Sequence, residues 1–176
     1  GRIEQKLIDR GLEENTLIIF TADNGTDIHI LTQTKDGPYP GGKSFTNQRG
    51  IHVPMIASWP GMVNSPGDFY GIIDFNDFYP TLAEIAGIDI SNEKIDGMSF
   101  YNVLLGEKSE IKNASLIHYD PEWGRASRNR NRFALDKQYK LYQDGNFYNY
   151  RNDIEEEQPI AEPSNDEAVL KGNLQQ

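Results

Sequence analysis

A short apolar run that leads into two oxygen-rich side chains is the feature that most constrains the fold of this chain. Leu17–Phe20 has the pattern of a buried strand, and Asp23 and Asn24 follow it closely. Gly25 then lets the backbone turn sharply. Because ligands bind at the carboxyl ends of strands in open α/β sheets, this segment is a candidate ligand site.

The Asp23-Asn24 pair has the side-chain chemistry of a metal site. Carboxylate and amide oxygens are the ligands that Ca²⁺ and Mg²⁺ prefer, so both residues are candidate metal ligands. An Asp-Asn-Gly sequence is also typical of a simple turn. This segment alone does not separate the two interpretations.

Helical and strand patterns alternate in the first part of the chain, which is typical of a parallel α/β sheet. A helical pattern over Arg2–Leu12 leads into the first strand, and Val53–Trp59 predicts the second. Residues 72–73 predict a further short strand. Asp74 then caps an amphipathic helix, in which Pro80 either causes a kink or marks the first turn.

The second part of the chain has a different pattern, and we predict two domains, residues 1–110 and 111–176. Four strands are expected near residues 116–119, 132–136, 139–143 and 146–151, with Asp144-Gly145 as a hairpin turn. They predict a small antiparallel β subdomain, which ends in a C-terminal helix over Asn165–Gly172. The acidic run Glu155–Glu157 is predicted to be a solvated linker without a site.

A long loop over residues 25–50 shows no convincing period, and loops of this length inside compact domains are often functional. Gly41 and Gly42 would let the backbone approach a ligand, and Lys43 brings a positive charge suited to a phosphate or sulfate oxygen. Taken alone, Lys43 is more simply an exposed surface lysine. His52, just before the second strand, either contacts an anionic ligand or fixes a turn.

Two further groups of basic residues have open roles. His29 lies in the same long loop, and a group of arginines follows Trp123. The arginines either receive an anionic group or form a solvated surface that offsets nearby acids, and we favour the solvated surface. This arginine group comprises Arg125, Arg128, Arg130 and Arg132.

Charge and composition exclude several classes of protein. The formal net charge of -10 argues against a nucleic-acid partner, which requires a basic face. The chain contains no cysteine, which excludes disulfides, thiolate metal sites and cysteine nucleophiles within it. No apolar run reaches the length needed to span a bilayer, so we expect no membrane partner.

Taken together, these motifs resemble the later part of a type I sulfatase of the alkaline-phosphatase-like superfamily. The resemblance extends over nearly the whole chain, with the motifs in the family's order. The matching segments are Gly11-Leu12-Glu13-Glu14-Asn15-Thr16, Thr21-Ala22-Asp23-Asn24-Gly25, Gly41-Gly42-Lys43, Gly50-Ile51-His52-Val53-Pro54, Pro80-Thr81-Leu82 with Ala86-Gly87-Ile88, Asp96-Gly97-Met98-Ser99 and Tyr139-Lys140-Leu141. The implied fold class is α/β, the C-terminal part of an alkaline-phosphatase-like parallel sheet followed by the antiparallel subdomain.

The resemblance also implies a set of roles. Asp23 and Asn24 would bind a divalent metal, usually Ca²⁺ with Mg²⁺ as an alternative, and Lys43 would contact the sulfate. His52 stands where the family has Arg or His, and would support that site. Gln48 replaces a commonly acidic residue.

The family's nucleophile is a formylglycine made from Cys or Ser in a Cys/Ser-x-Pro-x-Arg element that lies upstream, together with two further aspartate ligands. The resemblance therefore implies part of an enzyme that hydrolyses sulfate monoesters of a sulfated small molecule or glycan. Its missing N-terminal part would be the chain's partner, and this fragment alone would be inactive. A periplasmic or secreted location is also implied, although the sequence itself leaves the compartment open.

Two other interpretations remain at this point. A phosphonate or phosphate monoester hydrolase of the same superfamily would share these residues and differ in its upstream nucleophile. A non-catalytic binding module would lack a nucleophile element altogether.

Overall fold

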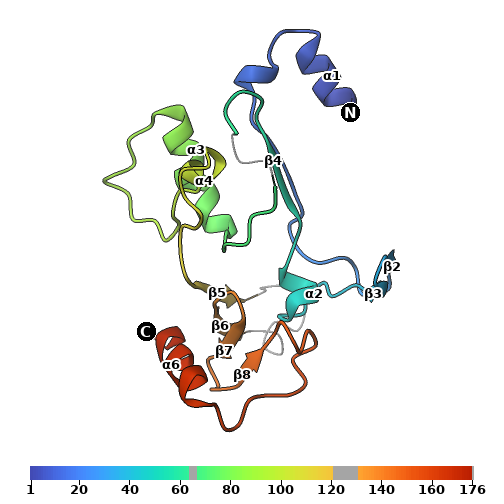
Figure 1. Cartoon of the computed structure of the whole chain (residues 1–176), viewed down its shortest axis with the longest axis vertical. Coiled ribbons are helices and arrows are strands. Elements are labelled where there is room, and N and C mark those ends of the chain that lie inside the picture. Colours follow the sequence, from blue (N-terminus) through green and yellow to red (C-terminus); the bar gives the residue numbers. More distant parts are fainter. Residues whose placement is uncertain (64–66, 121–130, 176) are drawn as a thin grey trace. The chain divides into compact units, whose positions relative to one another are not determined.

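The computed structural model describes residues 1–63, 67–120 and 131–175, which form two compact units (Figure 1). Unit 1 comprises Gly1–Phe20 and Met55–Asn113, and unit 2 comprises Thr21–Pro54 and Ala114–Gln176. Each unit therefore combines two separate stretches of sequence. The predicted domains divide the chain once, after residue 110, whereas each unit combines two stretches. The predicted domain boundary stays a prediction.

Unit 1 contains a two-stranded sheet and short helical elements. Strand β1 (Ile18–Thr21) pairs with β4 (Met55–Ser58), close to the two strands that the sequence predicts. The predicted strand at residues 72–73 does not form, and Ile73 packs against the apolar cluster around Phe100. The helical elements are α1 (Arg2–Ile8), η1 (Glu13–Asn15), η2 (Phe75–Asp77), α3 (Phe78–Ala86) and α4 (Tyr101–Leu104).

The β1–β4 sheet is less buried than the apolar sequence of β1 predicts. Phe20 on β1 and Ile56 on β4 each expose 61% of their surface. The expectation of a buried strand is therefore wrong for one side of β1, which the described residues leave uncovered. Apolar side chains such as Leu17 and Met55 instead pack against the cluster around Phe100.

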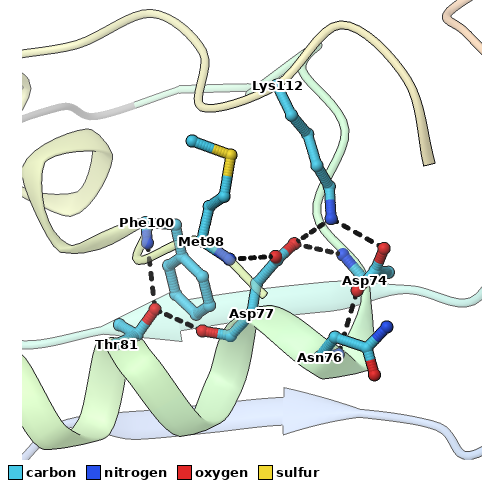
Figure 2. Close-up of polar contacts among 7 residues, drawn as sticks. All are labelled: Asp74, Asn76, Asp77, Thr81, Met98, Phe100 and Lys112. Carbon is cyan, nitrogen blue, oxygen red and sulfur yellow. Dashed lines mark hydrogen bonds and ion pairs between the residues drawn. The ribbon is translucent and has the colours of Figure 1, made fainter. Parts of the chain in front are cut away.

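A buried carboxylate, Asp77, connects the start of α3 to two distant segments of unit 1 (Figure 2). One carboxylate oxygen accepts the backbone N–H of Met98 at 2.8 Å, and the other accepts that of Asp74 at 2.8 Å. Lys112 places its ammonium 2.6 Å from carboxylate oxygens of both aspartates. The buried charge is therefore paired and fully hydrogen-bonded, as a buried carboxylate requires.

The predicted helix cap at Asp74 is confirmed by this arrangement. Asp74 accepts the N–H of Asn76 at 2.9 Å and forms a reciprocal capping pair with Asp77. Pro80 lies in the first turn of α3, where its missing N–H costs no helical hydrogen bond. The first-turn alternative for Pro80 is therefore correct.

Unit 2 is built around an antiparallel meander, as the sequence predicts. Its strands are ordered β5-β6-β7-β8, and helix α6 packs against β7 through Leu170 and Leu174. Ser164 caps α6 by accepting the N–H of Glu167 at 3.4 Å. The elements are β5 (Ser115–Tyr119), β6 (Asn131–Leu135), β7 (Tyr139–Tyr142), β8 (Phe147–Asn149) and α6 (Asn165–Leu174).

The long loop of unit 2 has more regular structure than its sequence predicts. Strands β2 (Leu31–Thr34) and β3 (Gly37–Pro40) form an antiparallel hairpin, and Gln48–Ile51 forms the short helix α2. All four β2 residues are exposed, so this hairpin carries no alternation of apolar and polar residues from which it could be predicted. The expectation of a loop without elements is therefore wrong.

The helices of the described residues are too short and too polar to cross a membrane.

Replacing Lys112 with methionine should destabilise unit 1 strongly, because the carboxylate of Asp77 is 0% exposed and would lose its counter-charge. Breaking a buried ion pair from one side costs about 3–5 kcal/mol of unfolding free energy. Urea unfolding followed by circular dichroism measures this change. Lys94→Met, at an exposed position of the same unit, is the matched control and should leave the midpoint unchanged. Equal midpoints for both variants would contradict the prediction.

Candidate functional site

The predicted site residues Asp23, Asn24, Lys43 and His52 all lie in unit 2. Asp23 and Asn24 follow the last residue of β1 directly after Ala22, as the sequence predicts. Asp23 is exposed and Asn24 is half-buried. The side chains of Asp23 and Asn24 therefore lie just beyond the C-terminal end of strand β1.

Three segments that are separate in sequence are joined here by backbone hydrogen bonds. Gly25 donates its N–H to the carbonyl of Gly50 at 2.9 Å. The N–H groups of Gly42 and Lys43 donate to the carbonyl of Thr26 at 3.0 and 2.9 Å. The backbone of Lys43 is therefore fixed beside the residues that follow Asn24, while the roles assigned to these side chains stay predictions.

Glycine is needed where these segments meet, because their backbones are too close for a side chain. A Cβ atom at Gly25 would lie 1.9 Å from the carbonyl oxygen of Arg49, and one at Gly50 would lie 2.0 Å from that of Phe45. Contacts this short do not occur between real atoms, so any larger residue would separate the segments. The glycines thus set the spacing of the site.

Lys43 lies in a tight turn that exposes its side chain. Phe45 donates its N–H to the carbonyl of Gly42 at 2.9 Å, and Ser44 has a left-handed backbone with φ 76°. Such a conformation is uncommon for a residue other than glycine and marks a strained turn. Strain of this kind is retained where surrounding contacts fix the backbone.

The side chains of Asp23, Asn24 and Lys43 make no hydrogen bond or ion pair with the part of the chain that the structure describes. The backbones of Gly25 and Lys43 are held by hydrogen bonds, while the polar side chains of Asp23, Asn24 and Lys43 are free to bind a ligand. The donor set of one carboxylate, one amide oxygen and one ammonium suits a hard cation together with an anion. No group of three or more His, Cys, Asp or Glu side chains within residues 1–63, 67–120 and 131–175 could hold a metal ion.

His52 follows α2 and donates its backbone N–H to the carbonyl of Gln48 at 3.0 Å. Its side chain is exposed, yet the protein atoms around the ring lower the pKa of His52 below 6.5, because they disfavour the charged form. The guanidinium of Arg151 lowers this pKa further by repulsion. His52 is therefore neutral at neutral pH and can both donate and accept a hydrogen bond.

The other basic residues of the sequence analysis are placed only in part. His29 is exposed, and its backbone N–H donates to the Asp27 carboxylate at 2.9 Å. Arg132 is exposed on β6. The rest of the predicted arginine group, Arg125, Arg128 and Arg130, lies outside the described residues.

Sequence reasoning missed the residues that hold the loop after Lys43. Glu155 pairs with Arg49, and Glu156 pairs with Lys140, which also donates to the carbonyl of Thr46 at 2.6 Å. The prediction of a solvated linker is therefore wrong for these two glutamates. Asn47 and Glu155 are separated by 108 positions, so no local pattern could have indicated this contact.

Replacing Arg151 with glutamine should raise the pKa of His52, because the change removes a nearby positive charge. The new value should stay below 6.5, because the larger cause, the partial loss of water around the ring, is unchanged. NMR titration of the imidazole signals measures the shift. Arg10→Gln in unit 1 is the control and should leave the curve in place. If the pKa of His52 were unchanged in the Arg151→Gln variant, the proposed repulsion between Arg151 and the imidazole ring would be wrong.

Comparison with known proteins gives this site a family. Residues 42–175 match the family model described as N-sulphoglucosamine sulphohydrolase, C-terminal. The matched range includes Lys43 and His52. The chain is 36% identical to human arylsulfatase A, which it matches over 68% of its own length and 23% of the relative. It is 34% identical to a sulfatase of Formosa agariphila, over 83% of the chain and 29% of the relative.

Rat steryl-sulfatase is 31% identical, over 68% of the chain and 22% of the relative. The chain thus spans less than a third of the length of these three relatives.

Solved structures support the same fold. One of them is the structure of BT4656 in complex with its substrate D-glucosamine-2-N,6-O-disulfate, with a TM-score of 0.75 and 23% sequence identity. The similarity extends over 99% of this chain and 35% of BT4656. Ps i-CgsB in complex with k-i-k-neocarrahexaose also covers 99%, with a TM-score of 0.70 and 24% identity, over 38% of that protein. These likenesses confirm the predicted α/β class of alkaline-phosphatase-like fold. The chain therefore belongs to the sulfatase family and carries that family's C-terminal region.

Proposed function

We propose that this chain supplies one side of the active site of an enzyme that hydrolyses sulfate monoesters. In this proposal Asp23 and Asn24 contribute oxygen ligands to a Ca²⁺ or Mg²⁺ ion, and Lys43 contacts the sulfate. The observation that supports it best is the pair of hydrogen bonds from Gly42 and Lys43 to Thr26, which fixes the lysine segment beside the carboxylate-amide segment.

The donor set fits a hard cation but does not complete its coordination. Ca²⁺ takes six to eight oxygen ligands, and Asp23 and Asn24 supply two side chains. The remaining ligands and the formylglycine nucleophile would come from an N-terminal part of the same enzyme. When bound, the metal would supply Lewis-acid polarisation of a sulfate oxygen, and the formylglycine would supply the attacking group.

The chain's own residues would bind and orient the ester. The Lys43 ammonium, which no carboxylate of the described residues neutralises, would offset negative charge on the non-bridging sulfate oxygens as it grows in the transition state. Neutral His52 would support the site as a hydrogen-bonding group rather than as a second cation.

A sugar is the favoured carrier of the sulfate, with an aryl group as the alternative. A polar hollow of about 370 Å³ lies beside the Lys43 turn, between the loop that contains Ser44 and Asn47 and the segment that contains Asn146 and, on β8, Tyr148. The lining combines hydroxyl and amide groups with the carboxylates of Asp144, Glu155 and Glu156, and such hydrogen-bonding groups suit the hydroxyls of a sugar. BT4656, which shares the fold, was solved with a sulfated glucosamine as its substrate.

Exposed apolar side chains in unit 1 support the need for a further part of the enzyme. Phe20 and Ile56 extend from the two sheet strands and are each 61% exposed. Additional strands and helices of a larger α/β sheet would cover such side chains. The proposed occupant is the N-terminal part that carries the nucleophile.

The isolated chain should not hydrolyse sulfate esters even with millimolar Ca²⁺, because it lacks a nucleophile and most of the metal ligands. Release of p-nitrophenol from p-nitrophenyl sulfate measures this, with the full-length enzyme as the positive control. Turnover by the isolated chain would contradict the proposal, and so would a full-length enzyme that hydrolyses p-nitrophenyl phosphate in preference to the sulfate.

In the full-length enzyme, Lys43→Ala should lower kcat by about 10²–10³-fold, which is typical for loss of one group that stabilises developing oxyanion charge. Asp23→Asn should weaken the binding of the metal ion. This is measured as a rise in the Ca²⁺ concentration needed for half-maximal activity. Lys35→Ala, an exposed lysine in the same loop, is the matched control and should keep wild-type kinetics. Equal losses in Lys35→Ala and Lys43→Ala would remove the assigned role of Lys43.

A further inference from the structure

Strand β7 directs its side chains to two different parts of unit 2. Tyr139 and Leu141 pack on the apolar cluster that includes α6. Lys140 and Tyr142, on the opposite face because side chains alternate along a strand, contact Thr46 in the loop that follows Lys43. All four residues of β7 are buried, so the strand connects the core of the subdomain to that loop.

Lys140 is a buried cation with three specific contacts. Its side chain is 0% exposed, and its ammonium donates to the Thr46 carbonyl at 2.6 Å and to the Glu156 carboxylate. It also lies 4.7 Å from the centre of the Phe133 ring. Apolar residues often replace a buried ion pair without loss of stability, so such a pair is weak evidence for a role in stability. The hydrogen bond to a backbone carbonyl indicates a role in fixing that backbone.

Thr46 is held at its side chain as well as at its carbonyl. The Tyr142 hydroxyl is 3.0 Å from Thr46 Oγ1 and also bonds to Glu156. Lys140, Tyr142 and Glu156 therefore form one connected network around a single loop residue. A fully satisfied buried network of this kind rigidifies the groups it contains.

The neighbouring glutamate holds the next part of the same loop. Glu155 pairs with Arg49 and accepts from the Asn47 amide at 3.4 Å. Glu156 has a left-handed backbone with φ 58°, an unfavourable conformation for this residue type. Such a conformation persists where the surrounding contacts over-determine it, and the contacts of Glu155 and Glu156 do so here.

The loop that these residues hold is the one that carries Lys43. Three positions separate Lys43 from Thr46, and the turn between them is closed by the hydrogen bond from Phe45 to Gly42. On its other side the Lys43 backbone is bonded to Thr26 at 2.9 Å. A shift of Thr46 would therefore be passed to Lys43 through a short and closed turn.

We infer that Lys140, Tyr142 and Glu156 form a positioning clamp, in which contacts from the antiparallel subdomain to Thr46 hold Lys43 in register with the Asp23-Asn24 segment. The inference rests on the proposed role of Lys43. The clamp residues are positioning residues, because they act on the loop and not on the substrate. The antiparallel subdomain is thus a support for the catalytic loop rather than a separate appendage.

Two variants of the full-length enzyme test the clamp. Thr46→Val removes the hydroxyl that Tyr142 contacts, and Thr46→Ser restores a hydroxyl as the conservative rescue. The double variant Lys140→Met, Glu156→Gln removes both charges together, so that no buried charge is left unpaired. Lys171→Met, which affects another lysine of unit 2 that bonds to Gly145 and not to the loop, is the matched control.

The expected result is faster hydrogen exchange at the amides of Gly42 and Lys43, by about tenfold, with exchange in β7 and α6 unchanged. kcat for a sulfate ester should fall about 10- to 100-fold at constant KM, because misplacing a transition-state contact affects the chemical step. Thr46→Ser should recover most of both losses. Lys171→Met should match the wild type in both measurements.

Wild-type exchange at Gly42 and Lys43 in both Thr46→Val and the double variant would overturn the clamp. Faster exchange with unchanged kcat would also overturn it, since the network would then be structural only. Failure of the proposed function is a different result, namely a wild-type enzyme that does not hydrolyse sulfate esters. The exchange measurement still decides whether the network holds the loop in that case.

Discussion

The close backbone contact between three loop segments is the constraint on which the candidate site depends. Gly25 and Gly50 pack without room for a Cβ atom, and the carbonyl of Thr26 receives two N–H groups from the lysine segment. These backbone hydrogen bonds hold the loop in one conformation before a ligand binds. The loop therefore loses little conformational freedom on binding. In the proposed site, the side chain of Lys43 would therefore reach a ligand from a fixed backbone, although Lys43 lies outside regular structure.

Unit 2 uses its antiparallel sheet for two purposes. One face of β7 completes an apolar core with α6, while the other face presents Lys140 and Tyr142 to the loop. The acidic turn that carries Glu155 and Glu156 completes this second face. The same strand alternation that builds the core thus supports the site, and a change in the register of β7 by one residue would exchange the two faces.

The elements that were predicted correctly are those with a strong local signal. The Asp74 cap and the Asp144-Gly145 turn depend on neighbouring residues, and the meander strands are short runs rich in apolar and aromatic residues. The hairpin β2–β3 was missed because both of its faces are exposed, and the role of Glu155 was missed because its partners are distant in sequence. The assignment of Lys43 to the same site as Asp23 and Asn24 came from family resemblance, since no spacing rule predicts it.

The exposed hairpin has one further property that follows from its two prolines. Gly41 donates its N–H to Ile30, so the alternate residues Pro38 and Pro40 direct their nitrogens away from β2, toward the free edge of β3. A proline nitrogen carries no hydrogen, so this edge lacks donors where an incoming chain would need them. The free edge of β3 is thereby protected against strand addition and edge-to-edge aggregation, although most residues of the hairpin are exposed to water.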